Sequence, residues 1–159
     1  MVAKVKDRPT TGVRYDEDRF TWVQEQVALL RAGRLDEIDA RNIAEELRDV
    51  GGSEYAQLES ALRVLIMHML KWDQQPEFRT RSWVYSIAEQ RDRYRRVLRK
   101  NPGLKQHLET IRSDVYPSAR RWAADETNLH ESEFPAECPY DWDTILNRPF
   151  ETDSVPPRP

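Results

Sequence analysis

The chain has 159 residues, of which 33% are charged, and its formal net charge is -3. This length suits one domain, since domains commonly hold roughly 100–200 residues. Cys138 is the single cysteine, which excludes an internal disulfide. No segment reaches the roughly 18 apolar residues of a membrane span, and the N-terminus lacks the apolar stretch of a signal peptide, so we expect a cytoplasmic protein that contacts no membrane.

Charge is distributed unevenly along the chain. Residues 16–49 carry ten acidic and five basic side chains, residues 77–105 carry nine basic and three acidic ones, and residues 106–159 carry eleven acidic and five basic ones. We interpret this as pairing between oppositely charged helices of one domain. The alternative, nucleic-acid binding through the arginine-rich helix 82–100, is less favoured because the chain as a whole is not basic.

The first half of the chain predicts three helices after a flexible leader over residues 1–14. Asp16 can cap the first helix and Asp39 the second, while Gly33 ends the first and Gly51–Gly52 interrupt the second. Their apolar positions recur at spacings of three and four: Phe20, Val23, Val27, Leu30, Ile43, Leu47 and Val50. The third helix, about 54–72, is almost wholly apolar from Ala61 to Trp72, which predicts a buried central helix.

The second half predicts two further helices and a short helical turn. Ser82 can cap a helix over 82–100, and the next helix begins at Leu104 and ends near residues 127–129. Pro117 lies inside that helix and predicts a kink or break near residues 113–116. A helical turn over 141–146 and a disordered, proline-rich tail over 148–159 complete the chain. The predicted fold is all-α: an irregular five-helix bundle forming one domain over residues 15–147.

His68 is the first candidate for chemistry, because it lies in the apolar central helix. The simpler interpretation is a neutral imidazole that is hydrogen-bonded inside the bundle. The alternative is that His68 meets Glu45 and Glu46 of the second helix, as ligands of a metal ion or as a proton-transfer pair in a metal-assisted hydrolase. No local cofactor or catalytic motif is present, so we expect no cofactor.

The connector from Lys71 to Trp83 is the second candidate, because it combines two tryptophans with many hydrogen-bond donors. Aromatic rings beside guanidinium groups suit cation–π stacking and the recognition of planar or anionic ligands. The alternative is that these groups only hold the connector in place. Arg91 and Arg95, one turn apart, should repel each other mildly, whereas Asp92 and Arg96 can pair. The candidate binding residues are His68, Lys71, Trp72, Gln75, Arg79, Arg81, Trp83 and Arg91.

Several stretches of the sequence resemble the bacterial proteins grouped as domain of unknown function 29. The resemblance extends over about residues 15–146 and implies an all-helical fold but no activity. The most specific matching positions are His68, Leu70–Trp72, Gln75–Pro76, Arg79, Ser82–Trp83, Glu89–Arg91, Glu126–Thr127 and Phe134–Tyr140.

These observations favour a helical binding or regulatory module whose site is the connector between the third and fourth helices. Its expected partner is a protein or a small anionic ligand, and a homo-oligomer is compatible with the sequence. The metal-assisted hydrolase and the nucleic-acid-binding protein remain as the second and third hypotheses.

Overall fold

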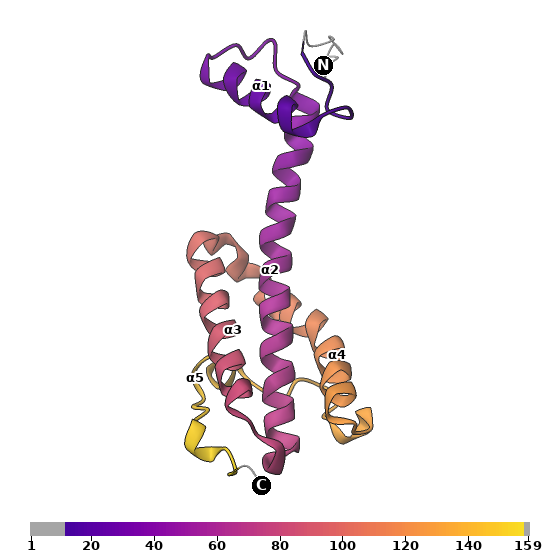
Figure 1. Ribbon diagram of the computed structural model, residues 1–159, viewed down its shortest axis with the longest axis vertical. Coiled ribbons are helices and arrows are strands. Elements are labelled where there is room, and N and C mark those ends of the chain that lie inside the picture. Colours follow the sequence, from indigo (N-terminus) through magenta and orange to yellow (C-terminus); the bar gives the residue numbers. More distant parts are fainter. Residues whose placement is uncertain (1–11, 158–159) are drawn as a thin grey trace. The chain divides into compact units, whose positions relative to one another are not determined.

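The computed structural model describes residues 12–157, and these form five α-helices and no strand (Figure 1). The helices are α1 (Arg19–Arg31), α2 (Ala40–Gln74), α3 (Arg81–Lys100), α4 (Leu108–Thr127) and α5 (Trp142–Asn147). The predicted all-α fold is therefore confirmed. Most of the predicted leader (residues 1–11) and the last two residues of the predicted tail lie outside the described residues.

The predicted second and third helices are one continuous helix, which is the main correction to the sequence analysis. α2 has 35 residues and runs through Gly51 and Gly52 without interruption. Each glycine in a helix interior costs about 1 kcal/mol relative to alanine. That cost weakens the helix locally, but the hydrogen bonds of the residues on both sides outweigh it.

The chain divides into two compact units, one extending to Gly52 and the other starting at Ser53. The single domain predicted over residues 15–147 stays a prediction, since this division does not decide whether the two units fold together.

In the first unit, α1 is capped by Asp18 instead of Asp16, because the Asp18 carboxylate accepts the Thr21 N–H at 3.0 Å. Asp39 caps α2 as predicted, accepting the Asn42 N–H at 3.2 Å.

α1 packs on the start of α2 through an unexpected face. The buried residues of α1 are Trp22 and Gln26, and the Gln26 side chain accepts the Asp39 backbone N–H at 2.7 Å. Tyr15 donates its hydroxyl to Glu46 at 2.6 Å. The predicted core position Phe20 is 75% exposed, so the apolar stripe of α1 is not the face that packs on α2.

The second unit contains the core, and its centre is the part of α2 that the sequence predicted. All of Leu58, Leu62, Leu65, Ile66 and Met69 are fully buried. Buried residues of α3, α4 and α5 and of the segment between α4 and α5 join them: Ile87, Tyr94, Val97, Leu98, Ile111, Val115, Tyr116, Ala119, Ala123, Ala124, Phe134, Tyr140 and Ile145. The prediction of a buried central helix is confirmed for this unit.

α4 begins and continues differently from the prediction. A 3₁₀ turn occupies Pro102–His107, and the α-helix starts only at Leu108. It then runs through Pro117 to Thr127, so the predicted break is absent. The proline is exposed, while its neighbours Val115, Tyr116 and Ala119 are buried. Burial of these neighbours offsets the cost of about 3 kcal/mol that proline imposes on a helix interior.

Arg148 and Phe150, which follow α5, contact α2 within the second unit, whereas the sequence predicted a disordered tail over residues 148–159. Arg148 forms a two-pronged ion pair with Asp73, with N–O distances of 2.7 and 3.0 Å. Phe150 meets Trp72 edge to face, with ring centroids 5.4 Å apart. The proline-rich composition of this segment indicated disorder. Composition could not show that Arg148 pairs with Asp73 and that Phe150 packs on Trp72, both in α2.

Candidate binding surface at the connector between α2 and α3

The connector is a short, well-defined turn. α2 ends at Gln74, a 3₁₀ turn covers Pro76–Phe78, and Thr80 caps α3. The Thr80 hydroxyl accepts the Trp83 backbone N–H at 3.3 Å, so α3 starts one residue before the predicted cap Ser82. Both ends of the connector are thus fixed by backbone hydrogen bonds.

Arg79 and Arg81, which the sequence presented as a pair, have different environments. Arg79 donates Nε–H to the Trp72 carbonyl at 3.0 Å, and its guanidinium carbon lies 4.5 Å from the centre of the Trp72 ring. Trp72 itself is only 4% exposed. Arg81 is exposed and makes no hydrogen bond or ion pair with the described residues. Arg79 therefore holds the connector on α2, and Arg81 is available to a partner.

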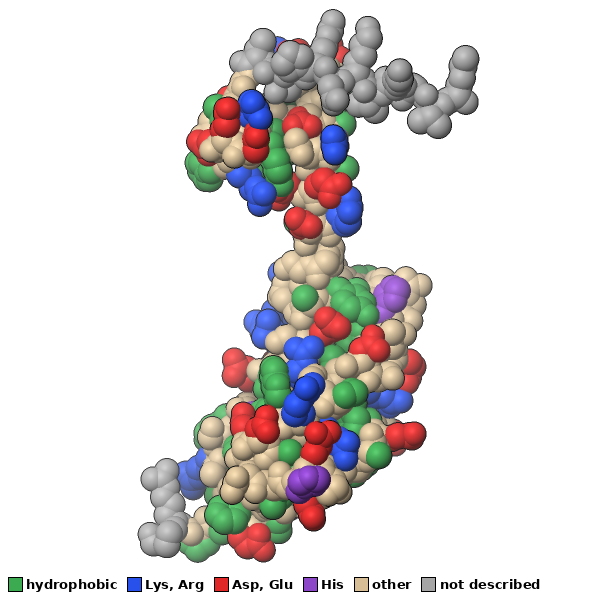
Figure 2. Space-filling view, turned by 90° about the vertical axis from the view of Figure 1, so that its right-hand side faces the viewer, with side chains coloured by type: hydrophobic (Ala, Val, Ile, Leu, Met, Phe, Trp, Pro, Cys, Tyr) green, Lys and Arg blue, Asp and Glu red, His purple; other side chains and the backbone are tan. Residues whose placement is uncertain are grey.

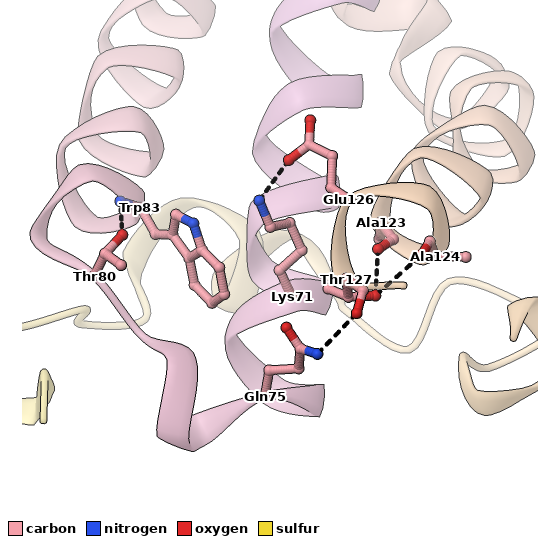
Figure 3. Close-up of polar contacts among 8 residues, drawn as sticks. All are labelled: Lys71, Gln75, Thr80, Trp83, Ala123, Ala124, Glu126 and Thr127. Carbon is pink, nitrogen blue, oxygen red and sulfur yellow. Dashed lines mark hydrogen bonds and ion pairs between the residues drawn. The ribbon is translucent and has the colours of Figure 1, made fainter. Parts of the chain in front are cut away.

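Lys71 is the buried charge of this region, with 5% of its surface exposed. Its ammonium binds the Glu126 carboxylate of α4 at 2.5 Å and lies 4.5 Å from the centre of the Trp83 ring of α3 (Figure 3). The Glu126 side chain is half exposed, so the lysine is the partner that bears the desolvation cost, and removing Glu126 would leave a buried charge uncompensated. Lys71 consequently ties together α2, α3 and α4.

Gln75 strengthens the same junction. Its side-chain amide donates to the Thr127 carbonyl at 3.0 Å, and the Thr127 hydroxyl donates to the Ala123 carbonyl at 2.6 Å (Figure 3). The first of these contacts satisfies the Thr127 carbonyl, which lies at the C-terminal end of α4 and has no partner within the helix. Gln75, like Lys71 and Arg79, is therefore used inside the fold.

His68 lies one turn before Lys71 on α2. Burial, followed by the charge of Lys71, lowers the pKa of His68 to about 4, whereas the charge of Glu126 opposes the shift. The imidazole is neutral at pH 7 for this reason. Its Nδ1 atom is buried and has no hydrogen-bond partner, which departs from the hydrogen-bonded imidazole that we had expected. The side-chain oxygen of Gln90 on α3 is also buried and has no hydrogen-bond partner.

Arg91 is a structural residue in this fold. Its guanidinium donates to the carbonyls of Ile145 (2.8 Å), Arg148 (2.7 Å) and Thr144 (3.3 Å) at the C-terminal end of α5. Arg95 donates to the Leu146 carbonyl at 3.1 Å and pairs with Asp92 at 3.4 Å, in place of the predicted Asp92–Arg96 pair. Burial, followed by the charges of Arg95 and Arg148, lowers the pKa of Arg91.

The metal hypothesis finds no support in the structure. It required Glu45 and Glu46 to lie on a separate helix facing His68, and α2 is continuous. Glu45 pairs with Arg48, and Glu46 accepts the Tyr15 hydroxyl and lies 3.5 Å from Arg19. Within residues 12–157, no three histidine, cysteine or acidic side chains are grouped so that they could hold a metal ion.

Two exposed aromatic residues near Arg81 were missed by the sequence analysis. Phe78, in the 3₁₀ turn, is 65% exposed, and Tyr85, one turn after Arg81 on α3, is 63% exposed. Residues four apart share a helix face, so the sequence could have linked Tyr85 with Arg81. Glu126 could not have been linked with Lys71, because the two are 55 residues apart and only packing joins them.

The fold and this surface define a class: an all-helical protein in which hydrogen bonds hold the connector between α2 and α3 in place. Phe78, Arg81 and Tyr85 are exposed at or beside this connector. None of the helices in the part of the chain that is described combines the length and apolar character of a membrane span. Residues 14–151 match the family described as domain of unknown function DUF29, and the chain belongs to that family. No curated protein and no solved structure matches the chain.

Proposed function

We propose that the protein is a non-enzymatic binding module and that Phe78, Arg81 and Tyr85 form its contact surface for a protein partner. The observation that carries this proposal is that some side chains of the connector make contacts inside the fold while others are exposed. Lys71, Gln75 and Arg79 are consumed by internal contacts, whereas Arg81 and the two flanking aromatic side chains are exposed.

Residue chemistry supports a protein partner over a small ligand. Tyrosine, phenylalanine and arginine are enriched in protein interfaces, and tyrosine and arginine recur among the residues that dominate the binding energy. A connector that is rigid before binding loses little conformational entropy on association. The partner that fits this surface offers an apolar pocket for the aromatic side chains and a carboxylate for Arg81. We further propose that the module acts in the bacterial cytoplasm, in keeping with its single free cysteine.

The test is affinity capture from native lysate followed by titration of the purified partner. The double variant Arg81→Ala/Tyr85→Ala should weaken binding at least about tenfold, since each such residue contributes more than about 1 kcal/mol when it is central to an interface. Arg99→Ala, an exposed arginine at the other end of α3, is the matched control and should bind as the wild type does. Equal binding by the double variant and the wild type would reject the proposal.

Arg79→Ala distinguishes a binding role from a structural one. This change leaves the Trp72 carbonyl without its side-chain donor and uncovers the Trp72 ring. We expect a loss of roughly 1–3 kcal/mol in unfolding free energy. Arg81→Ala should change stability by less than about 0.5 kcal/mol. If Arg81→Ala destabilises the chain as much as Arg79→Ala does, Arg81 is structural.

A further inference from the structure

The C-terminal part of α3 carries a run of positive charge at the protein surface. Of its last eight residues, 93–100, three are buried, and each of the other five is an arginine or a lysine. The buried residues are Tyr94, Val97 and Leu98. The cationic residues, which we call the basic patch, are Arg93, Arg95, Arg96, Arg99 and Lys100. All of them are exposed except Arg93, which is partly buried.

Most of these charges are not neutralised by the protein itself. We had expected oppositely charged helices to pair, but α3 does not pair in this way. Among residues 12–157, the only ion pair of the basic segment 77–105 joins Arg95 to Asp92 at 3.4 Å, and both lie on α3. The other four patch residues make no ion pair and no side-chain hydrogen bond with the described residues. The patch therefore keeps most of its charge for a partner.

Stabilisation of the helix end accounts for only part of the patch. Cations interact favourably with the C-terminal end of a helix, but this effect falls off within the last turn. Arg99 and Lys100 lie in the last turn of α3, whereas the three other patch residues precede it.

The rest of the second unit does not show such a run of one sign. α4 is as long as α3 and has four acidic and three basic residues. Blue and red side chains are intermingled on the face of the second unit that Figure 2 shows. Because protein surfaces ordinarily mix the two signs, a stretch whose surface residues are all cationic indicates an anionic partner.

The charge density of the patch matches that of a nucleic acid. A helix rises about 1.5 Å per residue, so the eight residues span about 12 Å and carry one positive charge per about 2.4 Å. Double-stranded DNA carries one negative charge per about 1.7 Å of its axis, or about 3.4 Å for each strand. The patch lies between these two values. An acidic protein helix would need a carboxylate at more than half of its positions to equal it.

The side chains of the patch suit the phosphates of a duplex. Four of the five are arginines, whose planar guanidinium groups bind phosphate through two parallel hydrogen bonds. Proteins bind single strands largely by stacking bases on exposed aromatic rings. The aromatic residue within 93–100 is Tyr94, which is 4% exposed and stacks on Trp142. The patch therefore fits a double-stranded backbone better than a single strand.

We propose that the basic patch binds the phosphate backbone of double-stranded DNA. It is a second surface, because Arg93 follows Arg81 of the proposed protein contact by about 18 Å along α3. Phosphate contacts carry no sequence information, so binding is independent of base sequence and weakens steeply with salt. The acidic residues of α3, Glu89 and Asp92, precede the patch. Acidic groups more than about 10 Å away are largely screened at 0.1 M salt, so a net charge of -3 does not prevent local binding.

The experiment is a fluorescence anisotropy titration of a labelled DNA duplex with the full chain at several salt concentrations. Four or five phosphate contacts predict a slope of about -4 when the logarithm of the association constant is plotted against that of the salt concentration. The affinity should accordingly fall roughly 100–500-fold between about 50 and about 200 mM salt. A second duplex of unrelated sequence should bind equally well.

Arg96→Gln/Arg99→Gln removes two exposed charges of the patch. It should weaken binding at least about tenfold and make the salt slope shallower by about 2. Arg31→Gln/Arg41→Gln is the matched control, because both arginines are exposed, lie in the first unit and form no ion pair with the described residues. The control changes the net charge equally and should bind as the wild type does. Glutamine is a good helix former, so circular dichroism should show unchanged helicity in both variants.

Two further measurements separate this inference from the proposed protein contact. Arg81→Ala/Tyr85→Ala should bind the duplex as the wild type does, and Arg96→Gln/Arg99→Gln should still capture the protein partner. No duplex binding at the lowest salt would overturn the inference, as would equal losses in the patch variant and its control. Tighter binding to a single strand of the same length would also overturn it. Displacement of the duplex by polyglutamate at equal charge concentration would assign the patch to acidic proteins instead.

Discussion

Leu47 and Leu65 are the same residue type on the same helix, and they lie in different units of the molecule. Leu47, in the first unit, is 67% exposed, whereas Leu65, in the second, is fully buried. α3, α4 and the segment that follows them supply the side chains that surround Leu65. In the described part of the first unit, by contrast, α1 covers only one face of α2. Whether the apolar residues of a helix are buried therefore depends on the segments that pack on it, and not on those residues alone.

The largest difference between the two regions should appear in alanine substitutions of these leucines. Leu65→Ala leaves a cavity in a close-packed core and should cost about 2–5 kcal/mol in unfolding free energy. Leu47→Ala removes an exposed side chain and should change the stability of the second unit by less than about 0.5 kcal/mol. Urea denaturation followed by circular dichroism measures both. Comparable losses in the two variants would contradict the contrast in burial.

A pH titration tests the interior of the second unit through His68. In the folded chain its pKa is lowered to about 4, whereas in the unfolded chain it is near the ordinary value of 6.5. Between these values the unfolded chain binds a proton that the folded chain does not. The stability is therefore complete above pH 6.5 and falls as the pH drops toward 4.

Because His68 is partly exposed, we expect it to account for only about 2 kcal/mol of that loss. His68→Gln removes the titrating group, so its unfolding free energy should depend less on pH in this range than that of the wild type. Acidic residues titrate in both proteins, and the difference between the two curves isolates the histidine. Parallel curves for wild type and variant would show that His68 keeps an ordinary pKa.

A smaller effect than that of His68 is expected at Gly51 and at Gly52, where α2 passes from the first unit to the second. Apart from the adjacent residues and the nearby backbone of the helix itself, no atom lies within 4 Å of the position that a Cβ would take at either glycine. Alanine at each position should therefore stabilise the helix by about 0.5–1 kcal/mol without a clash. Hydrogen exchange of the amides around residues 50–54 should slow in the double variant. Unchanged or faster exchange would mean that this part of α2 is not helical in solution.

The sequence predicted the helical elements better than it predicted their connections. Periodicity located the central helix and the helical turn near residues 141–146, because a buried helix must be apolar on several sides. It placed a break at Gly51–Gly52, since glycine is a poor helix former, but the surrounding residues sustain the helix. For α1, periodicity selected the face with Phe20, whereas packing buried Trp22 and Gln26.

For the candidate surface, the sequence identified the connector but not the roles within it. Arg79 and Arg81 are equivalent in composition and local pattern. They differ because one guanidinium reaches the Trp72 carbonyl and the other does not. Arg91 looked like a surface arginine, and it binds three carbonyls of the α5 region more than 50 residues away.

The sequence by itself determined that the chain is helical, where its most apolar helix lies and which connector is richest in donors. These properties follow from hydrophobic spacing and residue chemistry, which are local. Tertiary structure alone decided that Glu126 neutralises Lys71, that Asp73 holds Arg148 and that Leu47 stays exposed while Leu65 is buried. Such outcomes depend on which distant segments meet, and the free energy of those contacts is set by burial in the folded chain.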